Sequence, residues 1–495
     1  MQLLRTAAIR RLEQRHLSTA QPPLMEQAGL AAADYASELM QDRSGAIVVI
    51  AGNGNNGGDA YVCARHLKAR GHSVIVASPT TDKPLPADAA AARDDWLATG
   101  GDISEKLPAL GHYALAIDGL FGIGLGGPNG RPIEAPYSNW IALLNALKCP
   151  VLAIDIPSGL DADSGAFAGC CVRASHTITY IAAKPGLYMQ AGRDHVGNVR
   201  CANLGIEIDP HEEIDSGRLI STADFESALQ PRLHNSHKGT NGSAAIIGGA
   251  SGMAGAALLA GRAALNLGAG RVYVGMLAPL PVDYAQPELM LREVTDAIEH
   301  ADVIGIGPGL GQSEGALATL KLAIATDKPL AIDADGLNLI AAHPVLVTHI
   351  ARRSAPTLLT PHPTEAARLL GCDTSTIQQD RISSALQLSQ RFNAAVVLKG
   401  SGSVVALPNG HWYINGNGNG GLATAGTGDV LLGFVTALLA QDNDAATALL
   451  AAVHMHGAAA DLLVETGTGP VGLTAGELIS PARDIWNDWI ISEQS

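Results

Sequence analysis

The chain is poor in aromatic side chains and in positive charge, and each shortage narrows the classes of protein to which it can belong. Aromatic residues make up only 4% of the 495 residues, although hydrophobic residues of all kinds make up 47%. The core material is therefore mainly Ala, Leu, Val and Ile, as is common in α/β sheets. The net charge of -15 argues against nucleic acid or an anionic membrane as the main partner, because both attract clustered Lys and Arg.

Cysteines and long apolar runs are scarce as well. The six cysteines show no CxxC spacing, and the adjacent pair Cys170 and Cys171 is poorly placed for an ordinary structural disulfide. We therefore expect a reducing, cytoplasmic compartment. No apolar run lasts the roughly 18 residues of a membrane span, and polar residues interrupt positions 1–16 too often for a signal peptide. We expect an ordinary helix at the start and no membrane partner.

The sequence is rich in glycine, with 56 residues, and several of these glycines follow short apolar runs. The run at 46–51 (AIVVIA) leads through GNGNNGGD into a helical stretch at 60–71. Similar apolar runs follow at 72–78, 113–118 and 150–155, each ending in Gly, Asp or Ser. This alternation predicts a doubly wound, Rossmann-like parallel sheet, in which ligands bind beyond the carboxyl ends of the strands.

The length of the chain requires more than one domain, because single cores stop growing near roughly 250 to 300 residues. The stretch from 208 to 233 is acidic and irregular, and we place a boundary near residue 215. The second half again alternates strands and helices and shares no alignable motif with the first. We therefore expect two different α/β domains, at 1–215 and 223–490.

The glycine-rich segment of the first half has the composition of a phosphate site. At the start of a helix, free N–H groups and the helix dipole favour anions, and glycine lets the backbone approach closely. The alternative is a tight turn that binds nothing. The residues in question are Asn55, Asn56, Gly57, Gly58 and Asp59.

Two carboxylates follow neighbouring strands of the same half. Asp118 ends one apolar run, Asp155 ends the next, and Ser158 follows shortly after. With Asn56, they could form an oxygen cage for a hard cation, while one carboxylate handles protons. The alternative is that both aspartates cap helices.

Five segments of the first half together resemble the NAD(P)HX epimerase family: LMEQAG (24–29), GNGNNGGD (52–59), DGLFGIGLGGP (118–128), DIPSGLDADSG (155–165) and KPGL (184–187). The resemblance implies a potassium ion at Asn56, Asp118 and Ser158, and Asp155 as the acid/base that interconverts the two epimers at C6 of the hydrated ring. It implies hydrate contacts from Asn55 to Asp59, from Asp155, and from Gly122, Ile123, Gly124, Leu125, Gly126, Gly127 and Pro128. Ala60 departs from the pattern, since many members have glycine there.

The second half contains TAGTGD at 424–429, between a glycine-rich stretch and an apolar helical run. Gly426 and Gly428 can present backbone N–H groups to a phosphate at the helix start, and Asp429 lies beside them. A carboxylate next to such an anion hole suits a base that deprotonates a hydroxyl during phosphoryl transfer. The alternative is that Asp429 caps the helix.

This motif resembles the anion hole of the ribokinase-like superfamily, as do GPGLG (307–311), DADGLN (333–338) and LKGSGSVV (398–405). HKGTNG (237–242), GGASGMAGAALLA (248–260) and TPHPTE (360–365) resemble the ADP/ATP-dependent NAD(P)HX dehydratases in particular. Arg271 departs from that pattern, in which an apolar residue commonly precedes the valine.

The second resemblance implies that Asp429 takes the hydroxyl proton while a phosphoryl group is transferred to the hydrate, after which phosphate is eliminated. It implies ADP as donor, the usual choice of fused bacterial-type chains, and magnesium as a further cofactor. Asp333 and Asp335 are either magnesium ligands or turn formers. The implied hydrate contacts are Ala254, Gly309, His362 and Asp429, and the implied nucleotide contacts are Lys399, Gly400, Ser401, Gly402, Ser403 and Gly428.

Other interpretations remain open. The GTGD motif would serve a small-molecule kinase equally well, and a rival interpretation of the first half is a module that binds a nucleotide or partner without catalysis. His362 alone would more often be structural, and we expect His454 and His456 to be structural because residues two apart on a helix face different directions. The resemblance favours a homo-oligomer, preferably a tetramer. The preference between NADHX and NADPHX is not readable from the sequence.

Overall fold

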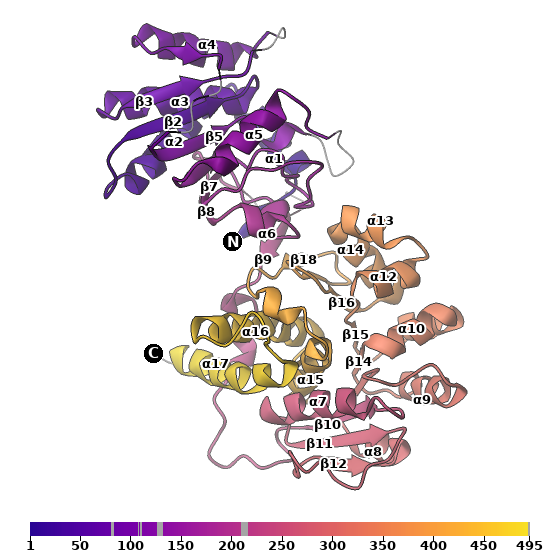
Figure 1. Cartoon of the computed structure of the whole chain (residues 1–495). Helices are drawn as coiled ribbons and strands as arrows, with labels where there is room; N and C mark the ends of the chain where they lie inside the picture. Colours follow the sequence, from indigo (N-terminus) through magenta and orange to yellow (C-terminus); the bar gives the residue numbers. More distant parts are fainter. Residues whose placement is uncertain (81–83, 107, 109–110, 126–131, 209–215, 494–495) are drawn as a thin grey trace. The chain divides into compact units, whose positions relative to one another are not determined.

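The computed structural model describes residues 1–80, 84–106, 108, 111–125, 132–208 and 216–493. The chain divides into two compact units, Met1–Gly217 and Arg218–Ser495, and each is described by itself (Figure 1). Of the residues that we predict as hydrate contacts, Gly126, Gly127 and Pro128 lie outside the described part of the chain.

The first unit is built on a parallel sheet with the strand order β4-β3-β2-β5-β6-β7-β8. From β2 the chain moves outward to β3 and β4, and it then returns to the other side of β2 to add β5. The order therefore reverses between β2 and β5, which is where doubly wound sheets bind their ligands. The strands of this sheet are β2 (Ala46–Ala51), β3 (Val74–Ala77), β4 (Ile103–Ser104), β5 (Tyr113–Gly119), β6 (Val151–Ile154), β7 (His176–Tyr180) and β8 (Asn198–Ala202). The short strand β1 (Gln2–Leu4) also belongs to the unit but is not part of this sheet.

Helices cover both faces of this sheet. One core cluster joins a sheet face to α1, α2, α3 and α4, and a second joins the other face to α5. The helices are α1 (Thr6–His16), α2 (Leu24–Leu39), α3 (Asn55–Ala69), α4 (Ala87–Ala98), α5 (Tyr137–Ala146) and α6 (Gly192–His195), with short 3-10 turns η1 (Ile123–Leu125) and η2 (Pro185–Leu187). The expected opening helix is α1, and the expected doubly wound sheet is confirmed.

The second unit contains a mixed sheet whose order runs β9-β18-β17-β16-β15-β14-β13-β10-β11-β12. The part from β16 to β12 is parallel, and β17 is antiparallel to both β16 and β18. The strands are β9 (Ser216–Leu219), β10 (Ser243–Gly248), β11 (Arg271–Met276), β12 (Met290–Arg292), β13 (Val303–Ile306), β14 (Leu330–Ile332), β15 (Thr357–Leu359), β16 (Ala395–Leu398), β17 (Val404–Ala406) and β18 (Trp412–Ile414).

The largest core cluster of the second unit lies between this sheet and the helices α7, α15, α16 and α17. Helix α15 follows directly on the GTGD motif and is apolar along nearly its whole length, so it is buried on all sides. The helices are α7 (Ala254–Asn266), α8 (Val294–His300), α9 (Glu314–Ile324), α10 (Ala334–Ala342), α11 (Val345–Ala351), α12 (Pro363–Leu370), α13 (Thr374–Gln379), α14 (Arg381–Phe392), α15 (Thr427–Ala440), α16 (Ala445–Glu465) and α17 (Ile479–Ser492), with 3-10 turns η3 (Thr222–Asp224), η4 (Glu226–Ala228), η5 (Gly420–Leu422) and η6 (Ala475–Leu478).

The expectation that no segment has the length and apolarity of a membrane span needs correction. Helix α16 is 21 residues long and apolar enough to meet both requirements. However, 67% of its apolar window is buried inside the unit, against α15 and α17. Its apolar character is therefore explained by its place in the core.

Candidate active sites

The amide-rich and glycine-rich segment of the first unit is part of a helix. Helix α3 begins at Asn55, so Asn55 to Asp59 form its first turn and not, as we expect from the sequence, a turn before it. The helix starts directly after β2, at the point where the strand order reverses. A Cβ on Gly57 would lie 1.9 Å from the Gly52 carbonyl oxygen, so only glycine allows this close approach of the helix to the preceding loop.

Asp118 and Ser158, from two neighbouring strand ends, are bonded to each other. Ser158 donates its backbone N–H to Asp118 Oδ2 at 2.8 Å and its hydroxyl to Oδ1 at 2.6 Å. Leu120 N–H donates to Oδ1 at 3.2 Å, and Phe121 N–H donates to Ser158 Oγ at 2.9 Å. Burial raises the pKa of Asp118 to about 6 in spite of these hydrogen bonds.

Asn56 lies at the same site with its polar atoms unpaired. Its side chain is 7% exposed, and neither Nδ2 nor Oδ1 has a hydrogen-bond partner among the described residues. Leaving a buried amide unpaired costs on the order of 1 to 3 kcal/mol per group, so such an arrangement calls for a missing partner. A Cβ placed on Gly122 would lie 3.3 Å from Asn56 Oδ1 and 3.1 Å from Asp155 Oδ2, which puts these three residues together.

Asp155 forms a buried ion pair that our sequence prediction does not include. Lys184 Nζ lies 2.6 Å from Asp155 Oδ1, and it also donates to Thr179 Oγ1 at 2.8 Å and to the Tyr180 carbonyl oxygen at 2.9 Å. Asp155 has a φ of 66°, a left-handed conformation that costs energy for a non-glycine residue. Strain of this kind is concentrated at functional sites.

Gly119, which lies against Ala60, leaves the space that the Ala60 methyl group needs. A Cβ on Gly119 would lie 2.5 Å from the Ala60 Cβ, so one of the two positions must be glycine where α3 crosses β5. The chain therefore keeps the helix close to the sheet despite the substitution.

In the second unit, a pocket of about 390 Å³ gathers residues from five parts of the chain. Asp429, Gly428, His362, Lys399 and Gly400, all predicted, line it. The predicted anion-hole residue Gly426 lines it with its neighbour Thr427, and so does Asp333, which we expect to be either a magnesium ligand or a turn former. Residues to which our prediction gives no role also line it: Ala334, Pro363, Glu365 and Leu422.

Asp429 lies in the first turn of α15, behind a glycine that starts the helix. Gly426 has a φ of +94°, and a Cβ there would lie 2.9 Å from Leu259 Cδ1, so glycine is required on both counts. Burial raises the pKa of Asp429 to about 6, the nearby Asp333 charge adds to the increase, and Lys399 opposes it. Asp429 is thus a carboxylate that is mostly ionised at neutral pH yet basic enough to accept a proton.

Lys399 connects the nucleotide segment to the strand end at Asp333. Its Nζ lies 2.7 Å from Asp333 Oδ1, and a Cβ on Gly428 would lie 3.2 Å from the same Nζ. The ammonium group therefore faces the backbone at the start of α15, where a phosphate would bind. Of the remaining nucleotide residues, Ser403 bonds back to Gly400. Ser401, Gly402 and Ser403 do not line the pocket.

His362 and Glu365 cap the start of α12 reciprocally. His362 Nδ1 accepts from the N–H groups of Thr364 and Glu365, and the His362 N–H donates to Glu365 Oε2 at 2.8 Å. Burial raises the pKa of Glu365 to about 7, against the opposing charge of Lys399. Our prediction misses Glu365, although the TPHPTE spacing, with its Glu at the third helical position, is that of a capping box.

Besides Ser401, Gly402 and Ser403, three further predicted residues lie apart from the described lining of this pocket. Ala254 begins α7, and a Cβ on Gly309 would lie 2.6 Å from the Met253 carbonyl oxygen, so these two are neighbours of each other. Asp335 accepts a hydrogen bond from the Gly311 N–H at 2.8 Å, which gives it a structural task.

The two histidines of α16 are both held in place. His456 Nε2 lies 3.0 Å from the Thr427 carbonyl oxygen, and His454 stacks on Trp489. Burial lowers the pKa of each to about 4, so both are neutral at neutral pH. Within the described residues, no three His, Cys, Asp or Glu side chains are grouped to hold a metal ion.

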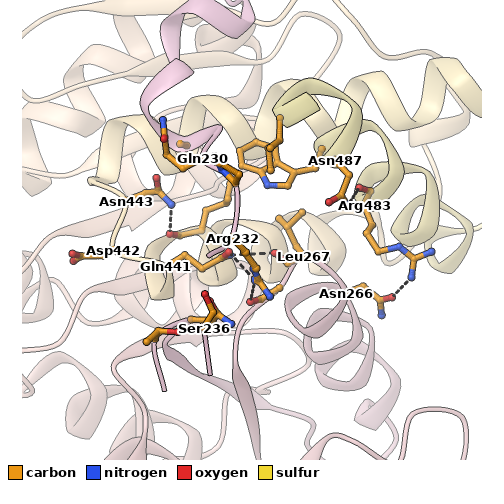
Figure 2. A pocket seen from close by; sticks show the side chains of 18 of the residues that line it. Gln230, Arg232, Ser236, Asn266, Leu267, Gln441, Asp442, Asn443, Arg483 and Asn487 are labelled. Atoms are coloured by element: carbon orange, nitrogen blue, oxygen red, sulfur yellow. Dashed lines mark hydrogen bonds between the residues drawn. The ribbon is translucent and has the colours of Figure 1, made fainter. Parts of the chain in front are cut away.

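A larger cavity, about 1040 Å³, lies at the other end of α15 and holds none of the predicted residues (Figure 2). Figure 2 shows Arg232 beside Gln441, and Arg483 directed at Asn266. Arg232 donates to the Gly268 carbonyl oxygen and to Gln441 Oε1, and Arg483 donates to Asn266 Oδ1. Both arginines are thus bonded within the chain, at helix carboxyl ends, where cations are stabilising.

Comparisons with known proteins match both units. Residues 244–480 match the family model described as NAD(P)H-hydrate dehydratase, and residues 21–186 match the one described as YjeF-related protein N-terminus. The chain is 41% identical over 450 residues to the bifunctional NAD(P)H-hydrate repair enzyme Nnr of Escherichia coli K12, covering 89% of this chain and 85% of that protein.

Further similarities extend across the length of the chain. It is 37% identical over 497 residues to the bifunctional NAD(P)H-hydrate repair enzyme of Leishmania braziliensis, covering 92% of this chain and 88% of that protein. A crystal structure of the ADP/ATP-dependent NAD(P)H-hydrate dehydratase of Bacillus subtilis, co-crystallised with ATP/Mg²⁺, is 30% identical and covers 55% of this chain and 99% of that one, with a TM-score of 0.49. The chain belongs to the family of bifunctional NAD(P)H-hydrate repair enzymes.

Proposed function

We propose that the first unit interconverts the R and S epimers of hydrated NADH and NADPH, and that the second unit dehydrates the S epimer at the expense of ADP. The observation that carries this proposal is that one chain of this family contains two sites at strand ends. Each site holds a carboxylate that is suited to proton transfer. Asp155 serves the first site and Asp429 the second.

The first site suits a potassium ion. The unpaired Asn56 amide, the buried Asp118 carboxylate and the Ser158 hydroxyl offer oxygen atoms, which hard cations prefer. The ion would supply positive charge beside the hydrate's pyrophosphate. Asn55, Gly57, Gly58 and Asp59 at the start of α3 would bind that pyrophosphate, and Gly122 to Leu125, continuing to Pro128, would contact the hydrate.

A test of this ion has a readout other than catalysis. Replacing potassium by tetramethylammonium should lower the melting temperature of the first unit, because the Asn56 amide and the Asp118 charge lose their partner. The Asn56→Leu variant should melt at the same temperature in both salts. If the wild type melts identically in the two salts, potassium does not bind at this site.

In the first site, Asp155 would exchange a proton with the hydroxyl on C6 of the hydrated ring. Lys184 supports this role, because its ammonium group, 2.6 Å from Asp155 Oδ1, holds the carboxylate in position. The strained backbone at Asp155 points the carboxylate toward Gly122 and Asn56. Proton transfer by a positioned side chain typically contributes about 10² to 10⁴ in rate.

In the second site, Asp429 would take the proton of the hydrate's ring hydroxyl as the terminal phosphoryl group of ADP is transferred to it. The N–H groups from Gly426 to Gly428 and the Lys399 ammonium would stabilise the charge on the phosphoryl oxygens. Phosphate then leaves C6 with the electron pair of its C–O bond as the ring nitrogen donates electrons, and loss of a proton from C5 to water forms the C5–C6 double bond and restores the dihydronicotinamide. AMP and phosphate are the other products.

Magnesium would neutralise phosphoryl charge in this pocket. Asp333 supplies a buried carboxylate there, but one of its oxygens is engaged by Lys399, and Asp335 bonds the Gly311 amide. We propose His362 as a hydrate contact and the segment from Lys399 to Ser403 as the nucleotide contact, with Ala254 and Gly309 at the outer end of the hydrate site. We further propose a cytoplasmic homo-oligomer, preferably a tetramer.

Variants of the two carboxylates test the assignment. With a pure R hydrate and ADP, Asp155→Asn should slow the recovery of reduced nicotinamide by about 10² or more, whereas a pure S hydrate should be dehydrated at the wild-type rate. Asp429→Asn should stop dehydration of both but leave epimerisation intact. A kinase of the same superfamily would instead accumulate a phosphorylated product, and that result would replace the dehydratase assignment.

A further inference from the structure

A buried arginine lies behind the segment that we propose binds the adenine nucleotide. Arg381 begins α14 and is 2% exposed. It touches Gly400, which lines the pocket of about 390 Å³: a Cβ on Gly400 would lie 2.9 Å from both Nη1 and Nη2 of Arg381. Gly400 also has a φ of +148°, so both the space and the backbone favour glycine there. The guanidinium group therefore lies directly against the wall of the pocket.

The guanidinium group of Arg381 is bonded to the backbone of this segment. Nη2 donates to the carbonyl oxygens of Leu398 at 3.0 Å, of Lys399 at 3.3 Å and of Gly402 at 3.4 Å. The carbonyl and the N–H of one trans peptide point in opposite directions, so the N–H groups that follow these carbonyls face away from Arg381. Arg381 thus fixes the shape of the segment from 398 to 402.

The positive charge of Arg381 has no carboxylate partner in the described part of the chain. Nη1 donates to the side-chain oxygen of Gln378 at 3.0 Å, and Nε has no hydrogen-bond partner among the described residues. The adjacent Asp380 accepts from Ser383 through both of its carboxylate oxygens. Burial lowers the pKa of Arg381 to about 10, so the group stays charged at neutral pH. A buried cation of this kind is costly until an anion approaches it.

A nucleotide in the pocket would bring that negative charge. The other cation at this wall, Lys399, is already paired with Asp333 at 2.7 Å. Arg381 lies behind the backbone of Gly400, and its charge reaches the pocket through protein rather than through water. Charges interact more strongly across the protein interior, because its effective dielectric constant is lower than that of water. The phosphate groups would therefore be attracted by Arg381 without contacting it.

We propose that Arg381 is a positioning residue for the adenine nucleotide. It holds the segment from Lys399 to Ser403 in the shape that binds ADP, and its unpaired charge attracts the phosphate groups. This inference rests on the proposed dehydratase function. Arg381 acts through the backbone of Gly400 and does not touch the reacting atoms, so its removal weakens the binding of ADP and not the chemical step.

The test compares the dehydration of a pure S hydrate in wild type and in Arg381→Met, whose side chain has neither charge nor donors. The KM for ADP should rise about 10-fold or more, because a displaced segment binds the nucleotide poorly. The kcat at saturating ADP and the KM for the hydrate should change little, because Lys399 and Asp429 are held by other elements. ADP should also raise the melting temperature of Arg381→Met less than that of wild type at the same concentration, a readout that needs no catalysis.

Arg353 provides the matched control, because its guanidinium group also donates to three backbone carbonyls of the same unit, those of Ile324, Thr326 and Lys328. Arg353 is not part of the described lining of the pocket. Arg353→Met should keep the wild-type KM for ADP even where its melting temperature falls. If Arg381→Met does not fold, Arg381→Lys and Arg353→Lys give the same comparison. Lysine keeps the charge but loses the planar fork, so the KM for ADP should rise only in Arg381→Lys.

The outcomes separate the role of Arg381 from the function on which it rests. An unchanged KM for ADP in the folded Arg381 variant, or an equal increase in the matching Arg353 variant, overturns the role of Arg381. A wild type that neither dehydrates the S hydrate with ADP nor is stabilised by ADP overturns the proposed ADP-dependent dehydratase function itself.

Discussion

At the scale of single residues, burial is the first cause of the raised pKa values of the site carboxylates. Burial raises the pKa of Asp118 and of Asp429 to about 6 and that of Glu365 to about 7, because a charged carboxylate is poorly solvated inside the protein. The opposing cation in the second site is Lys399. Carboxyl groups with such values exchange protons readily near neutral pH, which is what acid/base chemistry requires.

The raised pKa of Asp429 predicts the acid limb of the dehydratase. Below about pH 6 the carboxylate is protonated and cannot accept the hydroxyl proton, so kcat/KM should fall about tenfold per pH unit. Glu365→Gln removes the other carboxyl group with a raised pKa in this pocket. The acid limb should persist in this variant, because it arises from Asp429. A rate that stays level from pH 7 to about pH 5 would show that Asp429 is not the base.

The Asp155–Lys184 pair predicts a large loss of stability when it is broken. Lys184→Met leaves a buried carboxylate without its partner and should cost about 3 to 5 kcal/mol in the free energy of unfolding of the first unit. Arg200→Met breaks the exposed pair with Glu38 and should cost less than about 1 kcal/mol. Equal losses of unfolding free energy in urea denaturation would mean that another group compensates the Asp155 charge when Lys184 is replaced.

The sequence identifies the individual groups of both sites better than it identifies their partners. Asp118, Asp155 and Asp429 follow apolar runs or a glycine motif, and these are local signals. Lys184 lies 29 residues from Asp155, and Lys399 lies 66 residues from Asp333. Such pairs depend on how distant strands meet in the sheet, and no local pattern encodes them.

At the scale of elements, apolar runs predict strands well, and glycine misleads about helix starts. The run at 46–51 is β2, and the run at 113–118 is β5 with one residue more. Helix α3 begins at Asn55, earlier than the helical stretch at 60–71 suggests, because the glycines that look like a turn are needed for close contact with the Gly52 carbonyl.

Close helix contact also predicts a stability difference between two helical glycines. A Cβ on Gly433 of α15 would lie 2.3 Å from the Ala260 carbonyl oxygen of α7, so Gly433→Ala should destabilise the second unit by about 1 to 3 kcal/mol. Gly315 of α9 is exposed, with its nearest side-chain atom at 3.7 Å, so Gly315→Ala should stabilise by up to about 1 kcal/mol. Denaturation of both variants checks the sign, and equal shifts would contradict close α7–α15 packing.

At the scale of the whole molecule, each unit has its own sheet, core and site. The relatives that show the family cover 89% and 92% of this chain, and the expected Rossmann-like and ribokinase-like α/β halves agree with the two sheets. The simplest account is that the hydrate leaves one site and reaches the other through solvent.

Free exchange predicts that the two activities complement each other between separate chains. A mixture of Asp155→Asn and Asp429→Asn chains should repair the R hydrate as fast as wild type at the same concentration of each intact site. The control is a large excess of a chain that carries both Asp155→Asn and Asp429→Asn and is therefore inactive. This chain can only bind free hydrate, so it should slow the mixture and the wild type to the same extent. A mixture that is much slower than wild type would indicate direct transfer.

The measurement that tests the central claim most directly is the recovery of reduced nicotinamide absorbance from an R/S mixture of the hydrate, with ADP, in wild type, Asp155→Asn and Asp429→Asn. The account predicts full recovery in wild type, prompt recovery of only the S fraction in Asp155→Asn, and none in Asp429→Asn. Wild type without recovery, with either ADP or ATP, would contradict the repair function, and full prompt recovery in Asp155→Asn would contradict the assignment of the first site.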